Sequence, residues 1–101
     1  MIDIESGYLI EIKNTLQDIV PNCDVLVYGS RVRGNALKYS DLDLVVVGRE
    51  KLDWRIIEEL KDAFAESDLP YRVDILDWNA ISKEFQKAIE KHHETIQRAK
   101  D

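Results

Sequence analysis

The hydrophobic positions along this 101-residue chain repeat at two different spacings, and the helical spacing occurs three times. Apolar residues three or four apart form one face of a helix. Asp or Ser ahead of such a stretch starts a helix, and proline stops one. The pattern predicts helices over 4–20, from the cap residue Asp53 to a point before Pro70, and from Ser82 through Phe85, Ala88, Ile89, His92, His93 and Ile96.

Shorter apolar runs between these helices have the length and the flanking residues of strands. A short helical turn and a loop are expected within 31–40. The chain shows no repeat and no linker. We therefore predict one domain over residues 1–101 in the mixed α+β class, with a small mixed sheet of three to four strands flanked by helices. The three clearest strands cover 23–28, 41–47 and 71–76, and Gly29 and Gly48 end the first two.

Composition and charge narrow the class of protein. Hydrophobic residues make up 45% of the chain and charged residues 34%, as in a folded globular domain. The net charge of -6, with no basic block, argues against direct nucleic-acid binding. No apolar run is long enough to span a membrane and no basic leader precedes one, so a cytoplasmic protein is expected. Cys23 is the only cysteine, which excludes an internal disulfide.

Two aspartates open the second predicted strand. Asp41 and Asp43 are two residues apart, so their carboxylates lie on one face of the strand, about 7 Å apart along it. Such a pair can hold two divalent metal ions roughly 3.5 to 4 Å apart, which clamp the attacking and leaving oxygens of a displacement at phosphorus. Oxygen ligands favour Mg2+, with Mn2+ as a substitute. Solvated aspartates at a strand end are the simpler interpretation of the pair taken alone.

The turn after the first strand supplies the second part of a phosphate site. Gly29 can take a positive φ and lets a phosphate approach the backbone, while Ser30 adds a hydroxyl donor. A two-metal site commonly needs a third carboxylate, and Asp74 in the third strand is the candidate. A carboxylate inside a strand would be costly unless it met a cation or solvent. Asp77, at the end of that strand, is predicted to cap the turn that follows.

Gly29-Ser30, ten further residues, Asp41-Leu42-Asp43 and then Val73-Asp74-Ile75 form a long spaced motif. It resembles the motif of the minimal nucleotidyltransferases in the DNA polymerase beta superfamily, and in particular of MntA-type antitoxins that pair with HEPN toxins. The resemblance covers nearly the whole chain. It implies the small palm-like fold of polymerase beta and an enzyme that moves a nucleoside monophosphate, most simply AMP from ATP, onto a hydroxyl group.

The resemblance also implies roles for the acids and a partner. Asp41 and Asp43 would bind both of two Mg2+ ions, and Asp74 would complete the metal site and help to deprotonate the acceptor hydroxyl. The implied partner is a HEPN-domain toxin whose tyrosine is adenylylated, in a type VII toxin–antitoxin pair. A chain of this size has no room for a domain that grips the acceptor, which also favours a partner. Either a homo-oligomer or a hetero-oligomer is compatible with the sequence.

The same resemblance implies a set of nucleotide-binding residues. Gly29 and Ser30 would hold the β and γ phosphates. Arg33 would neutralise the charge of the triphosphate or of the leaving pyrophosphate. Ser40 would assist by orienting the first of the three acids. Arg31 could also reach phosphate, but we expect its side chain to be solvated.

Two other functions fit parts of the same pattern. An antitoxin could neutralise its toxin by binding and masking alone, with a vestigial nucleotide site, but the complete set of three acids argues against that version. A small-molecule nucleotidyltransferase of the aminoglycoside-modifying type would need a longer chain with a second domain. The resemblance therefore implies a protein adenylyltransferase that depends on ATP and Mg2+ and acts as an antitoxin, whereas the residues alone indicate only that the acceptor comes from a partner or a separate substrate.

Overall fold

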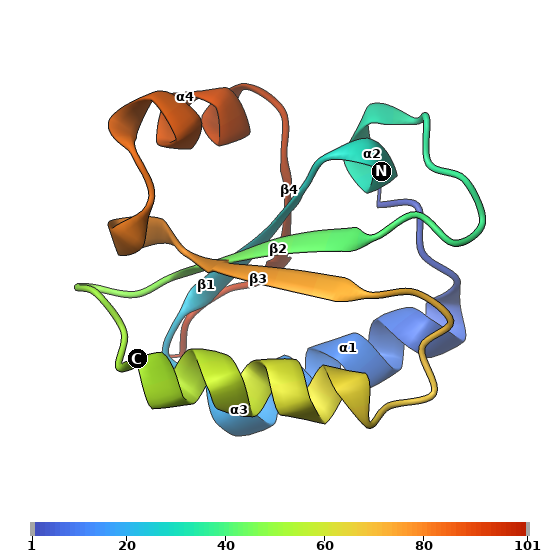
Figure 1. The fold of residues 1–101 in the computed structure, drawn as a ribbon, viewed down its shortest axis with the longest axis horizontal. Coiled ribbons are helices and arrows are strands. Elements are labelled where there is room, and N and C mark those ends of the chain that lie inside the picture. The colour runs from blue at the N-terminus through green and yellow to red at the C-terminus, as the bar shows by residue number, and fades with distance from the viewer. Residues whose placement is uncertain (1, 101) are drawn as a thin grey trace.

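The computed structural model describes residues 2–100, which form one mixed sheet with helices on both of its faces (Figure 1). The strands are β1 (Asp24–Tyr28), β2 (Leu42–Val47), β3 (Val73–Asp77) and β4 (Glu94–Gln97). Their order in the sheet is β3-β2-β1-β4. Strand β1 is antiparallel to β2 and to β4, whereas β2 and β3 are parallel. The predicted mixed α+β class is confirmed.

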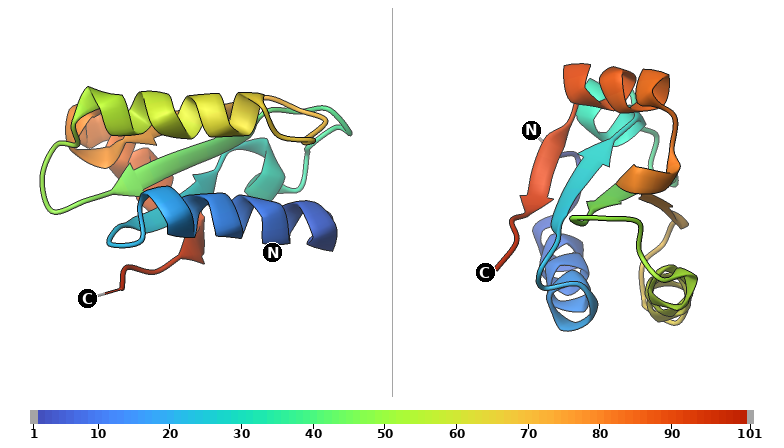
Figure 2. Two further views of the ribbon diagram at one scale, coloured as in Figure 1. Left: turned by 90° about the horizontal axis from the view of Figure 1, so that it is seen from below. Right: turned by 90° about the vertical axis from the view of Figure 1, so that its left-hand side faces the viewer.

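The helices divide between the two faces of the sheet. They are α1 (Ser6–Ile19), α2 (Ser30–Arg33), α3 (Trp54–Ala65) and α4 (Lys83–Lys91), and a 3-10 turn, η1 (Trp78–Ala80), follows β3. Figures 1 and 2 show α1 and α3 on one face and α2 and α4 on the other. Within residues 2–100 no helix is long and apolar enough to cross a bilayer.

The face of the sheet under α1 and α3 carries the main hydrophobic core. Ile12 and Leu16 of α1 and Leu60 and Phe64 of α3 are buried there. Alternate residues of each strand point to this face, which is the period of two expected for a sheet with one core-facing side. The side chains of the intervening strand residues point to the opposite face, which α2 and α4 cover. The core residues from the strands are Val25, Val27, Leu42, Leu44, Val46, Ile75 and Ile96.

Three predicted caps are confirmed. Asp53 and Ser82 accept hydrogen bonds from backbone N–H groups two and three residues later, at 3.0 and 3.1 Å. Asp77 accepts from the N–H of Asn79 at 3.0 Å, and its second oxygen accepts from the N–H of Leu52 at 2.7 Å. These side chains fix where α3, η1 and α4 begin.

The last helix is shorter than predicted, and this is the main error in the predicted fold. Residues 94–97 form the edge strand β4 beside β1 and do not continue α4. Ile96 therefore packs into the core from a strand, and His92 and His93 lie after the helix, with His92 extended at φ -152° and ψ 90°. The spacing from Ile89 to Ile96 fits a helix, but the open edge of β1 offers unpaired backbone groups that a strand satisfies.

Arg31 is buried, contrary to the sequence prediction, and it holds the loop before β2. Its guanidinium donates to the carbonyl oxygens of Asp3 at 2.9 Å, Ser40 at 2.7 and 3.2 Å, and Lys38 at 3.3 Å. It also lies 3.8 Å from the ring centroid of Tyr71. Because these contacts occupy most of its donors, we assign Arg31 to the fold and not to the nucleotide.

Replacing Arg31 by Met is expected to lower the free energy of unfolding by about 1–3 kcal/mol, because several carbonyl groups would lose their donor. Urea unfolding followed by circular dichroism measures the change. Arg98→Met, at an exposed position, is the control and should stay within about 0.5 kcal/mol of the native chain. An Arg31 variant as stable as that control would contradict the assignment.

Candidate active site

The strands bring the predicted acids to one end of the sheet. Asp43 pairs with Asp74 across the parallel β2–β3 ladder and with Tyr28 across the antiparallel β1–β2 ladder. Paired residues of neighbouring strands share a face of the sheet. Asp41 lies two residues before Asp43 and belongs to the same face. The structure therefore places all three acids on the side of the sheet that faces α2 and α4.

Gly29 lies directly beside Asp43. It links β1 to α2 with φ 78° and ψ -155°, a combination that is open almost only to glycine. A Cβ atom at this position would overlap the Oδ2 atom of Asp43. The glycine is therefore needed twice, for the backbone turn and for the space that the carboxylate occupies.

Helix α2 and the loop after it carry the other predicted nucleotide ligands. Ser30 is the first residue of α2 and is half-buried, where the helix leaves backbone N–H groups unpaired. Arg33 is the last residue of α2 and is exposed. The hydroxyl of Ser40 accepts a hydrogen bond from the N–H of Leu37 at 2.8 Å. Ser40 thus braces the loop that leads to Asp41, and its hydroxyl is used within that loop.

Arg72 is a candidate that the sequence analysis missed. Its guanidinium lies 3.3 Å from Oδ1 of Asp74 and 3.9 Å from Oδ2 of Asp41, so one cation bridges two of the three acids. The N–H of Leu42 donates to the carbonyl oxygen of Arg72 at 2.8 Å, which fixes its backbone beside the start of β2. The signal in the sequence is the spacing, because a residue two positions before Asp74 on an extended segment shares its face.

The carboxylate of Asp43 is less favourably charged than that of an ordinary aspartate. Burial raises its pKa, and the charges of Asp74 and Asp41 raise it further. Burial and then the charges of Asp43 and Asp74 raise the pKa of Tyr28 to about 12, so the Tyr28 hydroxyl keeps its proton at neutral pH. Negative charge is in excess on this face of the sheet, and a bound cation would relieve it.

The three acids fit a divalent cation by their chemistry. All of the donors are carboxylate oxygens, which Mg2+ and Mn2+ prefer. In the part of the chain that the structure describes, no three ligating side chains are already gathered as a metal cluster, and Asp41 and Asp74 instead contact Arg72. The three acids therefore fit a divalent ion in three respects: their donors are oxygens, they lie on one face of the sheet, and negative charge is in excess around Asp43.

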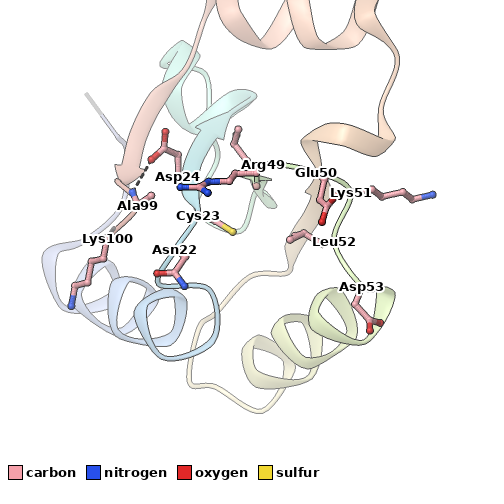
Figure 3. Close-up of a pocket in the computed structure, with 12 residues that line it drawn as sticks. Asn22, Cys23, Asp24, Arg49, Glu50, Lys51, Leu52, Asp53, Ala99 and Lys100 are labelled. Carbon is pink, nitrogen blue, oxygen red and sulfur yellow. Dashed lines mark hydrogen bonds between the residues drawn. The ribbon is translucent and has the colours of Figure 1, made fainter.

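A large hollow lies at the other end of the strands. It has a volume of about 880 Å³ and is lined by residues that include Asp24 and Val47 (Figure 3). Asp24 pairs with Val47, whereas Tyr28 pairs with Asp43, so about 13 Å of strand separates this hollow from the acids. A smaller hollow, of about 450 Å³, is lined by Asp74 itself. The large hollow is therefore not part of the acid site.

Comparison with known proteins shows the family of this chain. The pattern of the polymerase beta nucleotidyltransferases matches residues 8–101. A probable protein adenylyltransferase, MntA of Haemophilus influenzae, is 49% identical over 96 residues, which are 95% of this chain and 84% of that protein.

Solved structures share the fold. A mutant MntA–HpeT toxin–antitoxin has a TM-score of 0.75 at 21% identity, over 92% of this chain and 74% of the matched one. The tri-AMPylated HEPN toxin of Shewanella oneidensis in complex with the MNT antitoxin has a TM-score of 0.64 at 19% identity, over 96% of this chain and 74% of the matched one. The fold and the enzyme class predicted from the motif are confirmed, and the chain belongs to the polymerase beta family of nucleotidyltransferases.

Proposed function

We propose that this chain is a Mg2+-dependent protein adenylyltransferase that moves AMP from ATP onto a tyrosine hydroxyl of a HEPN-domain toxin. It would thereby act as the antitoxin of a type VII pair. The observation that carries the proposal is the placement of Asp43, in register with Asp74 and directly beside Gly29. The 49% identity to a probable protein adenylyltransferase supports the reaction class, and the toxin–antitoxin complexes among the structural relatives support the partner.

Nucleotide binding is assigned to the turn between β1 and β2. Gly29 brings the backbone close to the acids, so that the β and γ phosphates can lie against the start of α2. The Ser30 hydroxyl donates to a phosphate oxygen, and the exposed Arg33 offsets triphosphate charge. Ser40 holds the loop before Asp41 in place. This arrangement presents the α-phosphorus to the face that carries the acids.

The transfer step needs few groups from the protein. The acceptor oxygen forms a bond to the α-phosphorus, the bond to the oxygen that bridges to the β-phosphate breaks, and pyrophosphate leaves. Asp74 takes the proton of the acceptor hydroxyl. Mg2+ would be held by Asp41, Asp43 and Asp74, and when bound it neutralises charge on the oxygens around phosphorus. Placement and charge neutralisation account for catalysis by so small a site.

The acceptor is assigned to a separate protein. Residues 2–100 supply the acid site and the nucleotide turn, and the toxin–antitoxin complexes among the structural relatives favour an acceptor on a second protein. A toxin that docks here would bring its own tyrosine to Asp74. The pair would work in the cytoplasm, where ATP is available, and a hetero-oligomer is the assembly that this reaction requires.

Label transfer tests the proposal. The chain is incubated with ATP labelled at the α-phosphate, Mg2+ and a HEPN-domain protein from the same genome, and label on the toxin is measured. We expect label with the native chain and at least about a hundredfold less with Asp41→Asn, which removes a charge needed in the transition state.

Asp53→Asn is the matched control, because Asp53 is an exposed helix cap that lines the large hollow at the other end of the strands, and asparagine caps a helix equally well. Its label should equal that of the native chain. A toxin that is neutralised without label, by the native chain and by Asp41→Asn alike, would show that masking is the mechanism.

A further inference from the structure

Arg72 is the cation that the chain itself brings to the acid site. Its guanidinium lies 3.3 Å from Asp74 and 3.9 Å from Asp41, and the three side chains are 76%, 42% and 47% exposed. Exposed ion pairs add little to folding stability. The two contacts are therefore poorly explained as a device that holds the fold together.

The acids that Arg72 contacts are two of the three that the proposed function assigns to metal binding. Asp43, which lies in register with Asp74, has no such contact with Arg72 among the ion pairs of the described residues. A carboxylate that lies beside a guanidinium attracts a second cation less strongly, because the positive charge of the guanidinium repels that cation. Arg72 and a divalent ion therefore compete for Asp41 and Asp74.

We propose that Arg72 is a stand-in cation, which occupies the carboxylates until a divalent ion replaces it and so sets the ion concentration at which the site loads. The inference rests on the proposed function, because it takes Asp41 and Asp74 as metal ligands. In chemical terms the site exchanges one monovalent organic cation for a harder, divalent one.

The structure leaves Arg72 room to withdraw. Of the three acids only Asp74 lines the hollow of about 450 Å³, which Arg72 shares with Lys61 and Phe64 of α3 and with Leu69. The backbone of Arg72 stays fixed by its hydrogen bond from Leu42, at 2.8 Å. Exchange therefore needs a change of side-chain rotamers and no movement of the strands.

A titration with Mn2+ in the absence of nucleotide tests the proposal. The whole chain is titrated, and electron paramagnetic resonance measures the concentration of Mn2+ that stays free in solution. This readout does not require transfer activity. We expect Arg72→Gln to lower the Mn2+ concentration at half-saturation by about twofold to fivefold, which corresponds to an exposed ion pair of about 0.4–1 kcal/mol.

Arg55→Gln is the matched control. Arg55 is 75% exposed and pairs with Asp53 at 3.5 Å, so its loss changes the net charge equally but leaves the three acids alone. Its half-saturation should equal that of the native chain. Matching far-ultraviolet circular dichroism of the variants shows that each is folded.

Three results would overturn the stand-in role: unchanged half-saturation in Arg72→Gln, weaker Mn2+ binding in that variant, or an equal fall in Arg55→Gln. Weaker binding would mean that Arg72 supports the loaded site. The label-transfer assay separates this failure from failure of the proposed function. A chain that binds Mn2+ as expected but labels no toxin would refute adenylyl transfer and leave the exchange at the acids standing.

Discussion

Replacing Asp43 by Asn is expected to lower the rate of AMP transfer at least about a hundredfold and, without divalent ions, to raise the melting temperature by a few degrees. The two effects have one cause. Burial and the charges of Asp74 and Asp41 raise the pKa of Asp43, so its carboxylate destabilises the metal-free fold. The same carboxylate is the ligand that lies in register with Asp74.

The gain in stability should depend on pH. Because the folded pKa of Asp43 is raised, the folded chain keeps a proton that the unfolded chain loses, and stability falls as pH rises through that raised value. The advantage of Asn should vanish below the ordinary range of aspartate, about pH 4, and should grow as pH rises from there through the raised pKa of Asp43. Thermal melts in EDTA at several pH values measure it.

Asp53→Asn makes the same substitution at an exposed cap and should change neither the transfer rate nor the pH dependence of the melt. An Asp43→Asn chain that melts below the native one at neutral pH, or that still labels the toxin, would contradict the assigned role of Asp43.

Replacing Gly29 by Ala should damage stability and activity together. The backbone there, at φ 78° and ψ -155°, is nearly closed to alanine, which costs about 1–3 kcal/mol. The added Cβ would also overlap Oδ2 of Asp43 and push the carboxylate out of place. A displacement of about 1 Å at a reacting site can cost about a hundredfold in rate.

Gly34→Ala is the matched control for the second effect. Gly34 also has a positive φ, 83°, but a Cβ there meets nothing within 4 Å. It should lose about 1–2 kcal/mol of stability and keep its transfer rate. Urea unfolding and label transfer, run on both variants, separate backbone strain from displacement of the acid. Equal loss of activity in the two would mean that crowding at Asp43 is unimportant.

Much of the candidate site could be predicted, because its residues are close in sequence or lie two apart on a strand, where side chains point to the same face. Asp41 and Asp43 share a strand face by their spacing alone, and Gly29 stands at a strand end. The same alternation within β3 sets Asp74 opposite the apolar Val73 and Ile75, and the pairing of Asp74 with Asp43 puts the two acids on one face of the sheet. Helix caps at Asp53 and Ser82 could be predicted because they depend only on residues a few positions away.

The errors arose where distant parts of the chain decide the outcome. Burial of Arg31 depends on carbonyl groups supplied by Asp3 and Ser40, and no local pattern reveals them. The segment around Ile96 has helical spacing, but it became a strand because β1 has an edge to fill. Arg72 was overlooked because an arginine near a strand start is ordinary until its neighbours are known.

The pairing of β4 with β1 also bears on how the chain should be handled. Residues 94–97 cover the edge of β1, the strand that leads into Gly29. Beyond them the N–H of Lys100 donates to the carbonyl oxygen of Pro21 at 2.9 Å. If this segment were removed, the bare edge of β1 would become a template for strands from other molecules. Aggregation and strand exchange would then begin at the element that shapes the nucleotide turn.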